Sequence, residues 1–521
     1  MRNQGLKGFV ALRSGAFCAA DMKAVEMNCA ALGIGAAELM ENAAHAVSDF
    51  ISKSIEPGSN ILVFAGRGNN GGDGATSARH LMRDYNVTVA FLNGVKDMRE
   101  GPARANAEIM ASSRFANVLE NVSEMDYKEL SALMTGNDVI IDAIFGTGFS
   151  GSMPRWAGRV IEGINRYRKG HSVTVISVDL PSGMDADLGP GKDMVDADYT
   201  LTFHRTKKGL LGTKNKVRIC SIGIPPDAEL FCGPGDAWKA VQPRRLESSK
   251  RDNGTVLLIG GSSAYHGAPS SAAAAAYETL AALRTGAGYA KLYVPESIKL
   301  LAMQASPNII VGSMGRDFID YDSAGNAVKD LERADAIVLG MGIGRNEKTI
   351  DAVRRLVSMA GRLGKKTVLD ADALYAIKGM RMPGHGFVLT PHAGEMLALS
   401  GKDLKDAPLE EKIRQVIGAA KKLNATIVLK GHESVISDGK ALRVNRAGSS
   451  ALATMGTGDI LSGIIGGYAA TGAGVFDAAV AGVYLHSRIG DTLAVKRGNH
   501  ILAIDILERI PDVAREFDKN I

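Results

Sequence analysis

The chain has 521 residues, too long for one ordinary domain, so two or three domains are expected. Its 45% hydrophobic and 22% charged residues describe a globular protein, and no stretch approaches the ~20 apolar residues of a membrane span. The net charge of +5 comes from scattered lysines and arginines, with no run longer than Lys207-Lys208 or Arg244-Arg245. This pattern predicts a solvated basic surface and no nucleic-acid partner.

The cysteines and the N-terminus bear on where the protein works. Cys18, Cys29, Cys220 and Cys232 form no CxxC pair and show no metal-ligand spacing, so reduced thiols are expected. The first 15 residues lack the apolar core of a signal peptide. A cytoplasmic location without a membrane partner is therefore predicted.

Short β-branched runs alternate with helical patterns along the first half of the chain. The helical pattern that follows the first run covers Ala75–Arg83. The predicted strands are Ile61–Ala65, Val87–Phe91, Val139–Ile144, Val173–Val178, Tyr199–Phe203 and Val217–Ile222. This alternation favours a mostly parallel sheet with helices on both faces.

The second half repeats this alternation after an irregular stretch rich in Pro and Gly between residues 224 and 252. Helices are expected at Ser271–Arg284 and Lys348–Leu363. The predicted strands include Thr255–Ile259, Ala290–Val294, Ala336–Leu339, Lys366–Leu369, Phe387–Leu389 and Thr426–Leu429. The sequence thus predicts two unlike α/β domains, over residues 1–230 and 240–521.

Polar, Gly-rich segments follow three of the predicted strands in the first half. The first runs from Gly66 to Gly74, the second contains Asp142 and continues to Gly151, and the third begins at Asp179. Ligands of open α/β sheets bind beyond the carboxyl ends of the strands, so these segments predict one crevice. Glycines and a helix N-terminus would favour phosphate there.

These motifs resemble the YjeF N-terminal family, the NAD(P)H-hydrate epimerases. LMENAA, GRGNNGGDG, DAIFGTGFSG and VDLPSGMDAD carry the resemblance over roughly residues 15–225. It implies a Rossmann-like α/β/α sandwich in which Asp179 is the candidate proton shuttle. The residues implied to bind the hydrated cofactor are Asn69, Asn70, Gly71, Gly72, Asp73, Gly146, Thr147, Gly148, Phe149, Ser150, Gly151, Ser152 and Asp179. Asn70, Asp142 and Ser182 are implied K⁺ ligands, and their oxygen chemistry suits a hard cation.

The strongest local signal in the second half is the run from Ala451 to Gly463, which contains Gly456-Thr457-Gly458-Asp459 before an apolar helical pattern. Amides at a helix N-terminus attract phosphate. An aspartate in the first turn would lie close to a reacting phosphate and could accept a hydroxyl proton. Asp459 is therefore the candidate general base.

Other motifs in this half follow strands in the same way: GGSSAYHGAP, GMGIG, VLDADAL, LTPHAGE and LKG. With GTGD they resemble the ribokinase-like YjeF C-terminal family of ADP- or ATP-dependent NAD(P)H-hydrate dehydratases, over roughly residues 240–510. The resemblance implies hydrate contacts from Ala268, Gly342, His392 and Asp459. Nucleotide contacts are implied for Lys430, Gly431, His432, Glu433, Ser434, Ser449, Ser450, Thr454, Gly456, Thr457 and Gly458. Met455 stands where the family usually has glycine.

The two resemblances together imply a bifunctional repair enzyme for NADHX and NADPHX, the hydrated forms of NADH and NADPH. The first half would epimerise the R and S forms. The second would dehydrate the S form with Mg²⁺ and ADP, or with ATP, releasing AMP and phosphate when ADP is used. A homo-oligomer is expected.

Two alternatives stay open at this stage. A ribokinase-like small-molecule kinase fused to a Rossmann-like binding module would also need GTGD. An RNA-associated scaffold is disfavoured because Asp73, Asp142 and Asp179 are all present and no basic–aromatic tract occurs.

Overall fold

The computed structural model describes residues 6, 8–9, 15–263 and 268–519. The chain divides into two compact units, one over Ser14–Pro225 and one over Pro226–Ile521, and Leu6 and Phe9 belong to the second of these. Residues 226–240, which lie across the end of the predicted first domain, pack with the second unit, where Phe231 bridges to Val444. No helix within the described ranges combines the length and apolar content that crossing a membrane requires.

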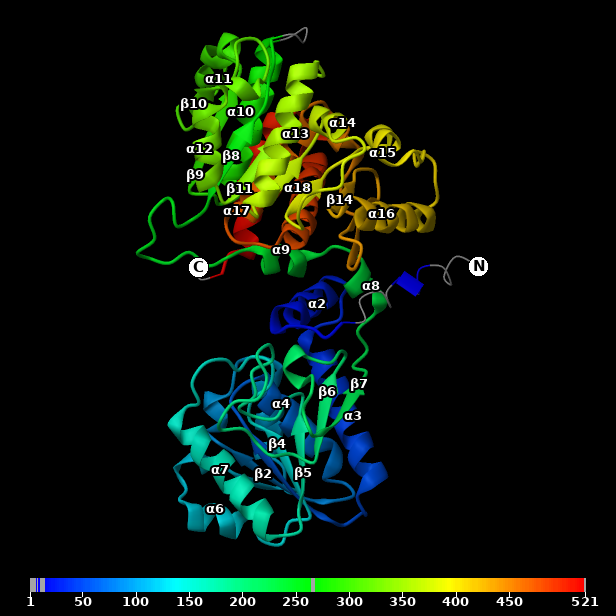
Figure 1. Ribbon diagram of the computed structural model, residues 1–521. Helices are drawn as coiled ribbons and strands as arrows, with labels where there is room; N and C mark the ends of the chain where they lie inside the picture. The colour runs from blue at the N-terminus through cyan, green and yellow to red at the C-terminus, as the bar shows by residue number, and fades with distance from the viewer. Residues whose placement is uncertain (1–5, 7, 10–14, 264–267, 520–521) are drawn as a thin grey trace. The chain divides into compact units, whose positions relative to one another are not determined.

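The first unit is built on a seven-stranded sheet in which every neighbouring pair is parallel (Figure 1). The strand order is β3-β2-β1-β4-β5-β6-β7. The strands are β1 Asn60–Ala65, β2 Asn86–Phe91, β3 Asn117–Leu119, β4 Val139–Ala143, β5 Thr174–Val178, β6 Tyr199–Phe203 and β7 Lys216–Cys220. The helices are α2 Ala19–Ala31, α3 Ala36–Ser54, α4 Asn69–Leu81, α5 Pro102–Ala111, α6 Tyr127–Met134 and α7 Arg155–Gly170. The order reverses between β1 and β4, and such a switch point opens a ligand crevice.

The second unit contains a nine-stranded sheet of order β10-β9-β8-β11-β12-β13-β14-β15-β16. Its strands are parallel up to β14, and β15 and β16 then add an antiparallel edge. The strands are β8 Thr255–Ile259, β9 Tyr289–Val294, β10 Ile310–Ser313, β11 Ala336–Leu339, β12 Lys366–Leu369, β13 Phe387–Leu389, β14 Thr426–Leu429, β15 Ser434–Ser437 and β16 Leu442–Asn445. The sequence did not predict β3, β10, β15 or β16, which are short strands at the sheet edges.

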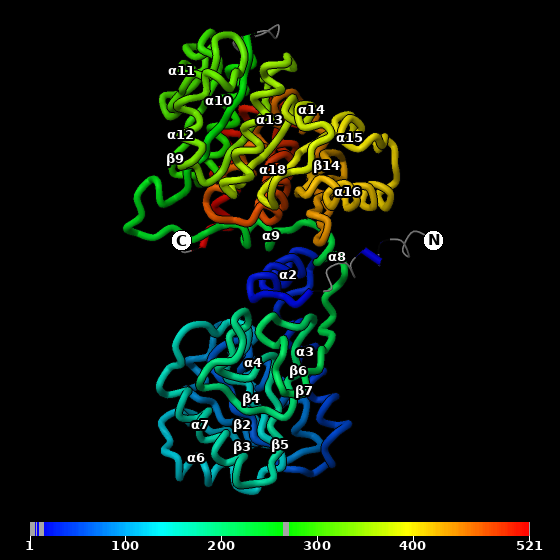
Figure 2. The backbone as a smooth tube through the Cα atoms, in the orientation of Figure 1, coloured from blue at the N-terminus to red at the C-terminus, as the bar shows by residue number. Residues whose placement is uncertain are grey.

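Helices cover both faces of this second sheet, as the backbone trace shows (Figure 2). They are α8 Pro226–Leu230, α9 Pro234–Ala240, α10 Ala268–Arg284, α11 Lys299–Ala305, α12 Gly325–Arg333, α13 Glu347–Arg362, α14 Asp372–Ala376, α15 Ala393–Ser400, α16 Leu409–Leu423, α17 Thr457–Ala470, α18 Val475–Arg497 and α19 Ala503–Ala514. Alternate residues of β8 enter opposite cores, since Val256 packs with α10 and α17 while Leu257 packs with α12 and α13. Both faces of the sheet are therefore buried, which is why its strands appear in the sequence as continuous apolar runs.

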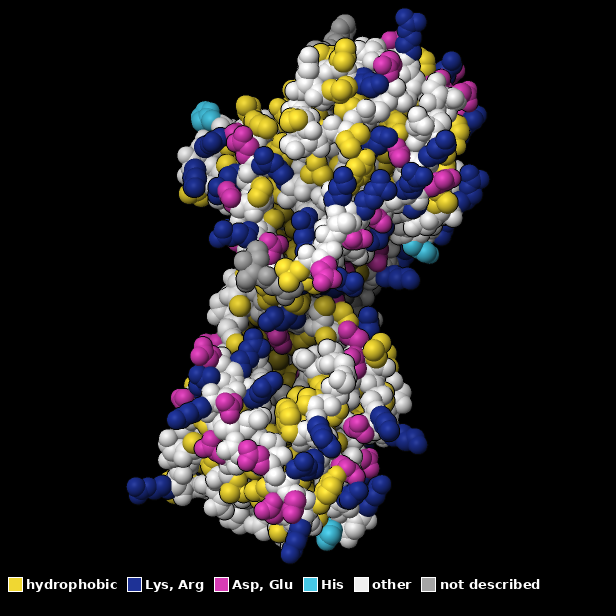
Figure 3. Space-filling model, turned by 90° about the vertical axis from the view of Figure 1, so that its left-hand side faces the viewer, with side chains coloured by type: hydrophobic (Ala, Val, Ile, Leu, Met, Phe, Trp, Pro, Cys, Tyr) yellow, Lys and Arg dark blue, Asp and Glu magenta, His cyan; other side chains and the backbone are white. Residues whose placement is uncertain are grey.

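The surface agrees with the scattered charge of the sequence. On the face shown in Figure 3, lysines and arginines lie singly or in small groups among acidic and apolar side chains. Lys207 is an exception to the predicted solvated surface, because its side chain is fully buried.

Candidate functional sites

The crevice of the first unit begins where β1 leads into α4. The sequence predicted a helix from Ala75, but α4 begins at Asn69, with Gly68 as its N-cap. Asn69–Asp73 therefore begin the helix, and the amides of residues 68–71 have no acceptor within it and can face an anion, whereas the Gly72 amide donates to the Gly68 carbonyl at 3.1 Å. A Cβ at Gly71 would lie 1.7 Å from the carbonyl oxygen of Gly66, so glycine lets this turn press against the strand end.

Three chain segments converge at Gly146, the first residue of the loop implied to bind substrate. A Cβ there would lie 3.1 Å from Oδ1 of Asn70 and 3.3 Å from Oδ2 of Asp179. Asn70 comes from α4 and Asp179 follows β5, so the fold brings together the motifs that the sequence placed in one crevice. Phe149 stacks on Phe145 at 4.9 Å between ring centroids, and residues 147–152 of the loop are half-buried or exposed.

Asp142 lies at the centre of a closed hydrogen-bond network under this loop. Its carboxylate accepts bonds from Ser177 Oγ at 2.7 Å, from the Ser182 amide at 2.8 Å and from Ser182 Oγ at 2.5 Å. Burial raises the pKa of Asp142, and the Ser182 hydrogen bonds oppose that shift. Among the described residues no cluster of three His, Cys, Asp or Glu side chains could hold a metal ion.

Asn70 provides the test of whether a monovalent cation fits. Its side chain is buried, and neither Oδ1 nor Nδ2 has a hydrogen-bond partner within the part of the chain that is described. A buried polar group without a partner is costly, so a ligand for Oδ1 would remove that cost. Ser182 Oγ donates its only proton to Asp142, accepts a bond from the Phe145 amide at 2.8 Å and keeps one lone pair. The oxygen set named from the sequence therefore fits K⁺.

Lys207 is the functional residue of this unit that the sequence did not reveal. Its ammonium lies 2.5 Å from Oδ1 of Asp179, although a Lys-Lys pair in a polar stretch is typical of a solvated surface. Glu26 of α2 was also missed. Burial and the nearby Asp179 carboxylate raise the pKa of Glu26. Burial, then Asp179 and Glu26, raise the pKa of Asp73 well above its ordinary range.

In the second unit, Asp459 lies in the first turn of α17, as the sequence predicted. Gly456 is the N-cap and takes a left-handed conformation with φ of 86°, which glycine adopts readily. Burial, with the Asp370 carboxylate next in importance, raises the pKa of Asp459 to about 7. Met455 is 89% exposed, so its side chain points away from the loop and the substitution leaves the turn at Gly456 intact.

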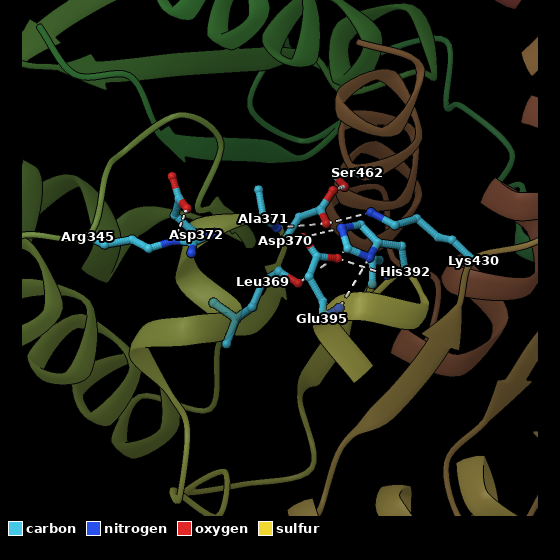
Figure 4. A network of polar contacts seen from close by, with 10 residues as sticks. Arg345, Leu369, Asp370, Ala371, Asp372, His392, Glu395, Lys430 and Ser462 are labelled. Carbon is cyan, nitrogen blue, oxygen red and sulfur yellow. Dashed lines mark hydrogen bonds and ion pairs between the residues drawn. The ribbon is translucent and has the colours of Figure 1, made fainter. Parts of the chain in front are cut away.

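Asp370 and Lys430 lie beside Ser462 of α17 (Figure 4), and a Cβ at Gly458 would lie 3.7 Å from Lys430 Nζ. Because β12 ends at Leu369, Asp370 and Asp372 follow the strand end. Asp370 accepts bonds from Lys430 Nζ at 2.8 Å and from Ser462 Oγ at 2.5 Å. Burial alone would raise the pKa of Asp370, but the Lys430 ammonium holds this pKa below its ordinary value.

His392 and Asp372 flank Asp370 on separate segments (Figure 4). His392 is the N-cap of α15, and its Nδ1 accepts a bond from the Glu395 amide at 3.2 Å while its exposed ring faces outward. Asp372 is bound to Arg345 at 2.8 Å and to the Gly344 amide at 3.2 Å. Gly342 has φ of 60° and its carbonyl accepts a bond from Ser271 Oγ at 3.2 Å.

The residues implied to hold the nucleotide fall into two groups. Lys430, Gly431, His432, Glu433 and Ser434 join β14 to β15, and the Lys430 ammonium is directed to Asp370. The other group leads into α17 and is ordered by short-range bonds, such as that from Thr457 Oγ1 to the Leu452 carbonyl at 2.8 Å. Ser449, Ser450, Thr454, Gly456, Thr457 and Gly458 form this second group. Ala268 begins α10, and its side chain lies outside the described residues.

These features define a two-unit α/β protein in which each unit has a carboxylate-bearing crevice at the carboxyl ends of parallel strands. The family model described as YjeF-related protein N-terminus matches residues 36–209, and the model described as NAD(P)H-hydrate dehydratase matches residues 256–512.

Relatives align along nearly the whole chain. The bifunctional NAD(P)H-hydrate repair enzyme of Pyrobaculum aerophilum is 36% identical over 504 residues, covering 95% of this chain and 97% of that protein. The enzyme of the same name from Hyperthermus butylicus is 33% identical, covering 95% and 92%. The solved ADP/ATP-dependent NAD(P)H-hydrate dehydratase of Bacillus subtilis is 25% identical over 56% of this chain and 99% of its own, with a TM-score of 0.46. The chain belongs to the family of bifunctional NAD(P)H-hydrate repair enzymes.

Proposed function

We propose that the protein repairs hydrated nicotinamide cofactors through two activities. The first unit interconverts the R and S forms of NADHX and NADPHX, and the second dehydrates the S form to NADH or NADPH while ADP is split to AMP and phosphate. The observation that carries this proposal is the similarity to bifunctional repair enzymes over 95% of the chain, which includes both crevices.

The dehydration follows from the placement of Asp459. Its carboxylate takes the proton of the C6 hydroxyl as that oxygen attacks the terminal phosphorus of ADP. Phosphate leaves from C6 more readily than hydroxide would, and its elimination, with loss of a C5 proton to solvent, restores the C5–C6 double bond of the reduced ring. A base with a pKa of about 7 suits this role, because general bases work best when their pKa lies near the working pH.

The loop at Gly456, Thr457 and Gly458 and the first-turn amides of α17 would hold the terminal phosphates. Lys430 keeps Asp370 charged and adds positive potential below the loop. Mg²⁺ bound to the nucleotide would neutralise phosphate charge, as this ion is usually held through substrate phosphates and few carboxylates. Gly342 and His392 would contact the hydrate, as would the backbone of Ala268.

For the epimerisation, Asp179 is the proton carrier and the loop of residues 146–152 receives the substrate. The first-turn amides of α4 suit the pyrophosphate of the cofactor. Asn70, Asp142 and Ser182 would hold K⁺, which would supply positive charge next to that anion. A homo-oligomer and a cytoplasmic location complete the proposal.

A small-molecule kinase is the alternative for the second unit, since Asp459 and the preceding turn would serve either reaction. A kinase would release a phosphorylated product, and the activity of the first unit would then be unrelated to that of the second. The family match of the first unit therefore favours repair.

The test is to incubate the purified protein with S-NADHX, Mg²⁺ and either ADP or ATP, and to follow the absorbance of reduced nicotinamide. We expect recovery of NADH with stoichiometric release of phosphate. Accumulation of a phosphorylated hydrate without NADH would contradict the dehydratase and favour the kinase. Chromatography of R-NADHX without nucleotide tests the first unit, where appearance of the S form is expected.

A further inference from the structure

Lys207 is a fully buried lysine in the first unit whose ammonium is completely engaged. Nζ donates to Asp179 Oδ1 at 2.5 Å, to Thr202 Oγ1 at 3.0 Å and to the Phe203 carbonyl at 2.8 Å. These contacts use the three donors of the ammonium. A buried charge carries a large desolvation cost, which a merely space-filling residue would not incur. The contact with Asp179 therefore indicates a specific role.

Asp179 is held in an unusual conformation by the same contacts. Its φ of 63° lies in the left-handed region that residues with a Cβ seldom adopt, and such strain often occurs at functional sites. Oδ1 takes the Lys207 ammonium, with the Thr202 hydroxyl and the Phe203 amide at 3.4 Å. Oδ2 points toward Gly146, where the substrate loop begins. One oxygen thus anchors the carboxylate and the other faces the crevice.

Three carboxyl groups share this crevice, and the ammonium contacts one of them. Glu26 comes from α2, Asp73 from α4 and Asp179 from the end of β5. The cations that act on Glu26 are Lys23, Lys207 and Arg99. The backbone around Lys207 also anchors the segment before α2, because the Phe17 amide donates to the Thr206 carbonyl at 2.8 Å and the Lys208 amide donates to the Phe17 carbonyl at 2.9 Å. Lys207 therefore forms its ion pair with Asp179, the carboxyl group that lies beside the substrate loop.

We propose that Lys207 is a positioning residue for epimerisation, which fixes the Asp179 side chain through Oδ1 and directs Oδ2 at the substrate. This inference rests on the proposed function of the first unit. Asp73 and Glu26, whose burial favours their protonated forms, are then the groups that can donate a proton while Asp179 accepts one.

Lys207→Met tests the proposal, because it removes the ammonium and keeps an unbranched side chain. Exchange of R and S epimers should fall by about 100-fold at pH 7, the low end of what general acid–base catalysis contributes. The loss should lie in kcat and leave KM unchanged, because the fully buried Lys207 acts through Asp179 and does not touch the substrate. Lys208→Met is the matched control: its exposed side chain predicts an unchanged kcat and KM.

A structural role would give a different result. If Lys207 acts through Asp179, adding Lys207→Met to Asp179→Asn should cause no further loss of exchange. Additive losses, or a wild-type kcat in Lys207→Met, would overturn the inference. Absence of exchange in the unmodified protein would instead refute the epimerase function itself.

Folding of the first unit is checked by the emission of Trp156, while Trp238 belongs to the second unit. Subtracting the emission of a Trp156→Phe variant isolates the contribution of Trp156. If Lys207→Met unfolds this unit, Lys207→Arg decides the question. The guanidinium keeps the charge but cannot repeat the three-point contact, so kcat should fall with KM unchanged. An unchanged kcat would contradict the positioning role.

Discussion

Each unit contains a lysine that binds an aspartate at the end of a parallel strand. The two units differ in whether that aspartate is the candidate proton acceptor. In the first unit, Lys207 binds Asp179, the candidate proton carrier. In the second, Lys430 binds Asp370, and Asp459 forms no ion pair with the residues that the structure describes. The pKa of Asp459 is accordingly raised to about 7, mainly by burial. The comparison teaches that the same residue types give an ion-paired anion in one crevice and a titratable base in the other.

The strongest test of this comparison is Asp459→Asn. We expect dehydration of S-NADHX to fall by about 10³-fold or more, because the amide cannot take the hydroxyl proton. Recovery of reduced-nicotinamide absorbance measures this loss. Epimer exchange by the same preparation should be unchanged, and retained dehydration would refute Asp459 as the base.

Asp179→Asn is the reciprocal change. Exchange between the epimers, followed by chromatography, should fall by at least about 100-fold, whereas dehydration of the S form should continue. The Lys207 ammonium would then be buried without its anion, so this variant should also unfold at a lower temperature. A variant with normal exchange would show that another group carries the proton.

The pH dependence of the two activities sharpens the contrast. Below about pH 7 Asp459 is protonated and cannot accept a proton, so kcat/KM for dehydration should fall tenfold for each further pH unit. Above that pH it should reach a plateau. Asp459 belongs to the second unit, so we expect exchange in the first unit not to follow this limb. Coincident limbs for both activities, measured with one preparation, would contradict the difference.

The smallest effect concerns Glu278 of α10, a fully buried carboxyl whose oxygens have no hydrogen-bond partner within the described ranges. Burial, then Asp459 and Asp370, raises its pKa well above the ordinary value of 4.5. The folded state therefore keeps a proton that the unfolded chain loses. Stability should decline by about 1.4 kcal/mol per pH unit above 4.5, until the folded-state pKa is reached.

Glu278→Gln should remove this slope, because the amide resembles the protonated acid in shape and does not titrate. Urea unfolding of the second unit at pH 5 and pH 8 would measure the difference, with a gain of at least about 1.4 kcal/mol expected at pH 8. Equal slopes in the two proteins would show that Glu278 is ionised in the folded state.

The sequence predicted the central strands well, because strands buried on both faces are continuous apolar runs such as Ile61–Ala65 and Thr255–Ile259. It missed the short edge strands, whose few residues carry little pattern. It also began α4 too late, since a run of glycines is a poor helix former by itself. Packing of Gly71 against Gly66 makes the earlier start possible, which is a tertiary effect.

The sequence by itself determined the order of the motifs, the mostly parallel architecture and the position of Asp459 in the first turn of a helix. These depend on local pattern and on spacing along the chain. Only the tertiary structure decided which charges meet, since Lys207 and Asp179 are 28 positions apart and Lys430 and Asp370 are 60 apart. Burial then sets the protonation of these groups, and burial depends on how distant segments pack.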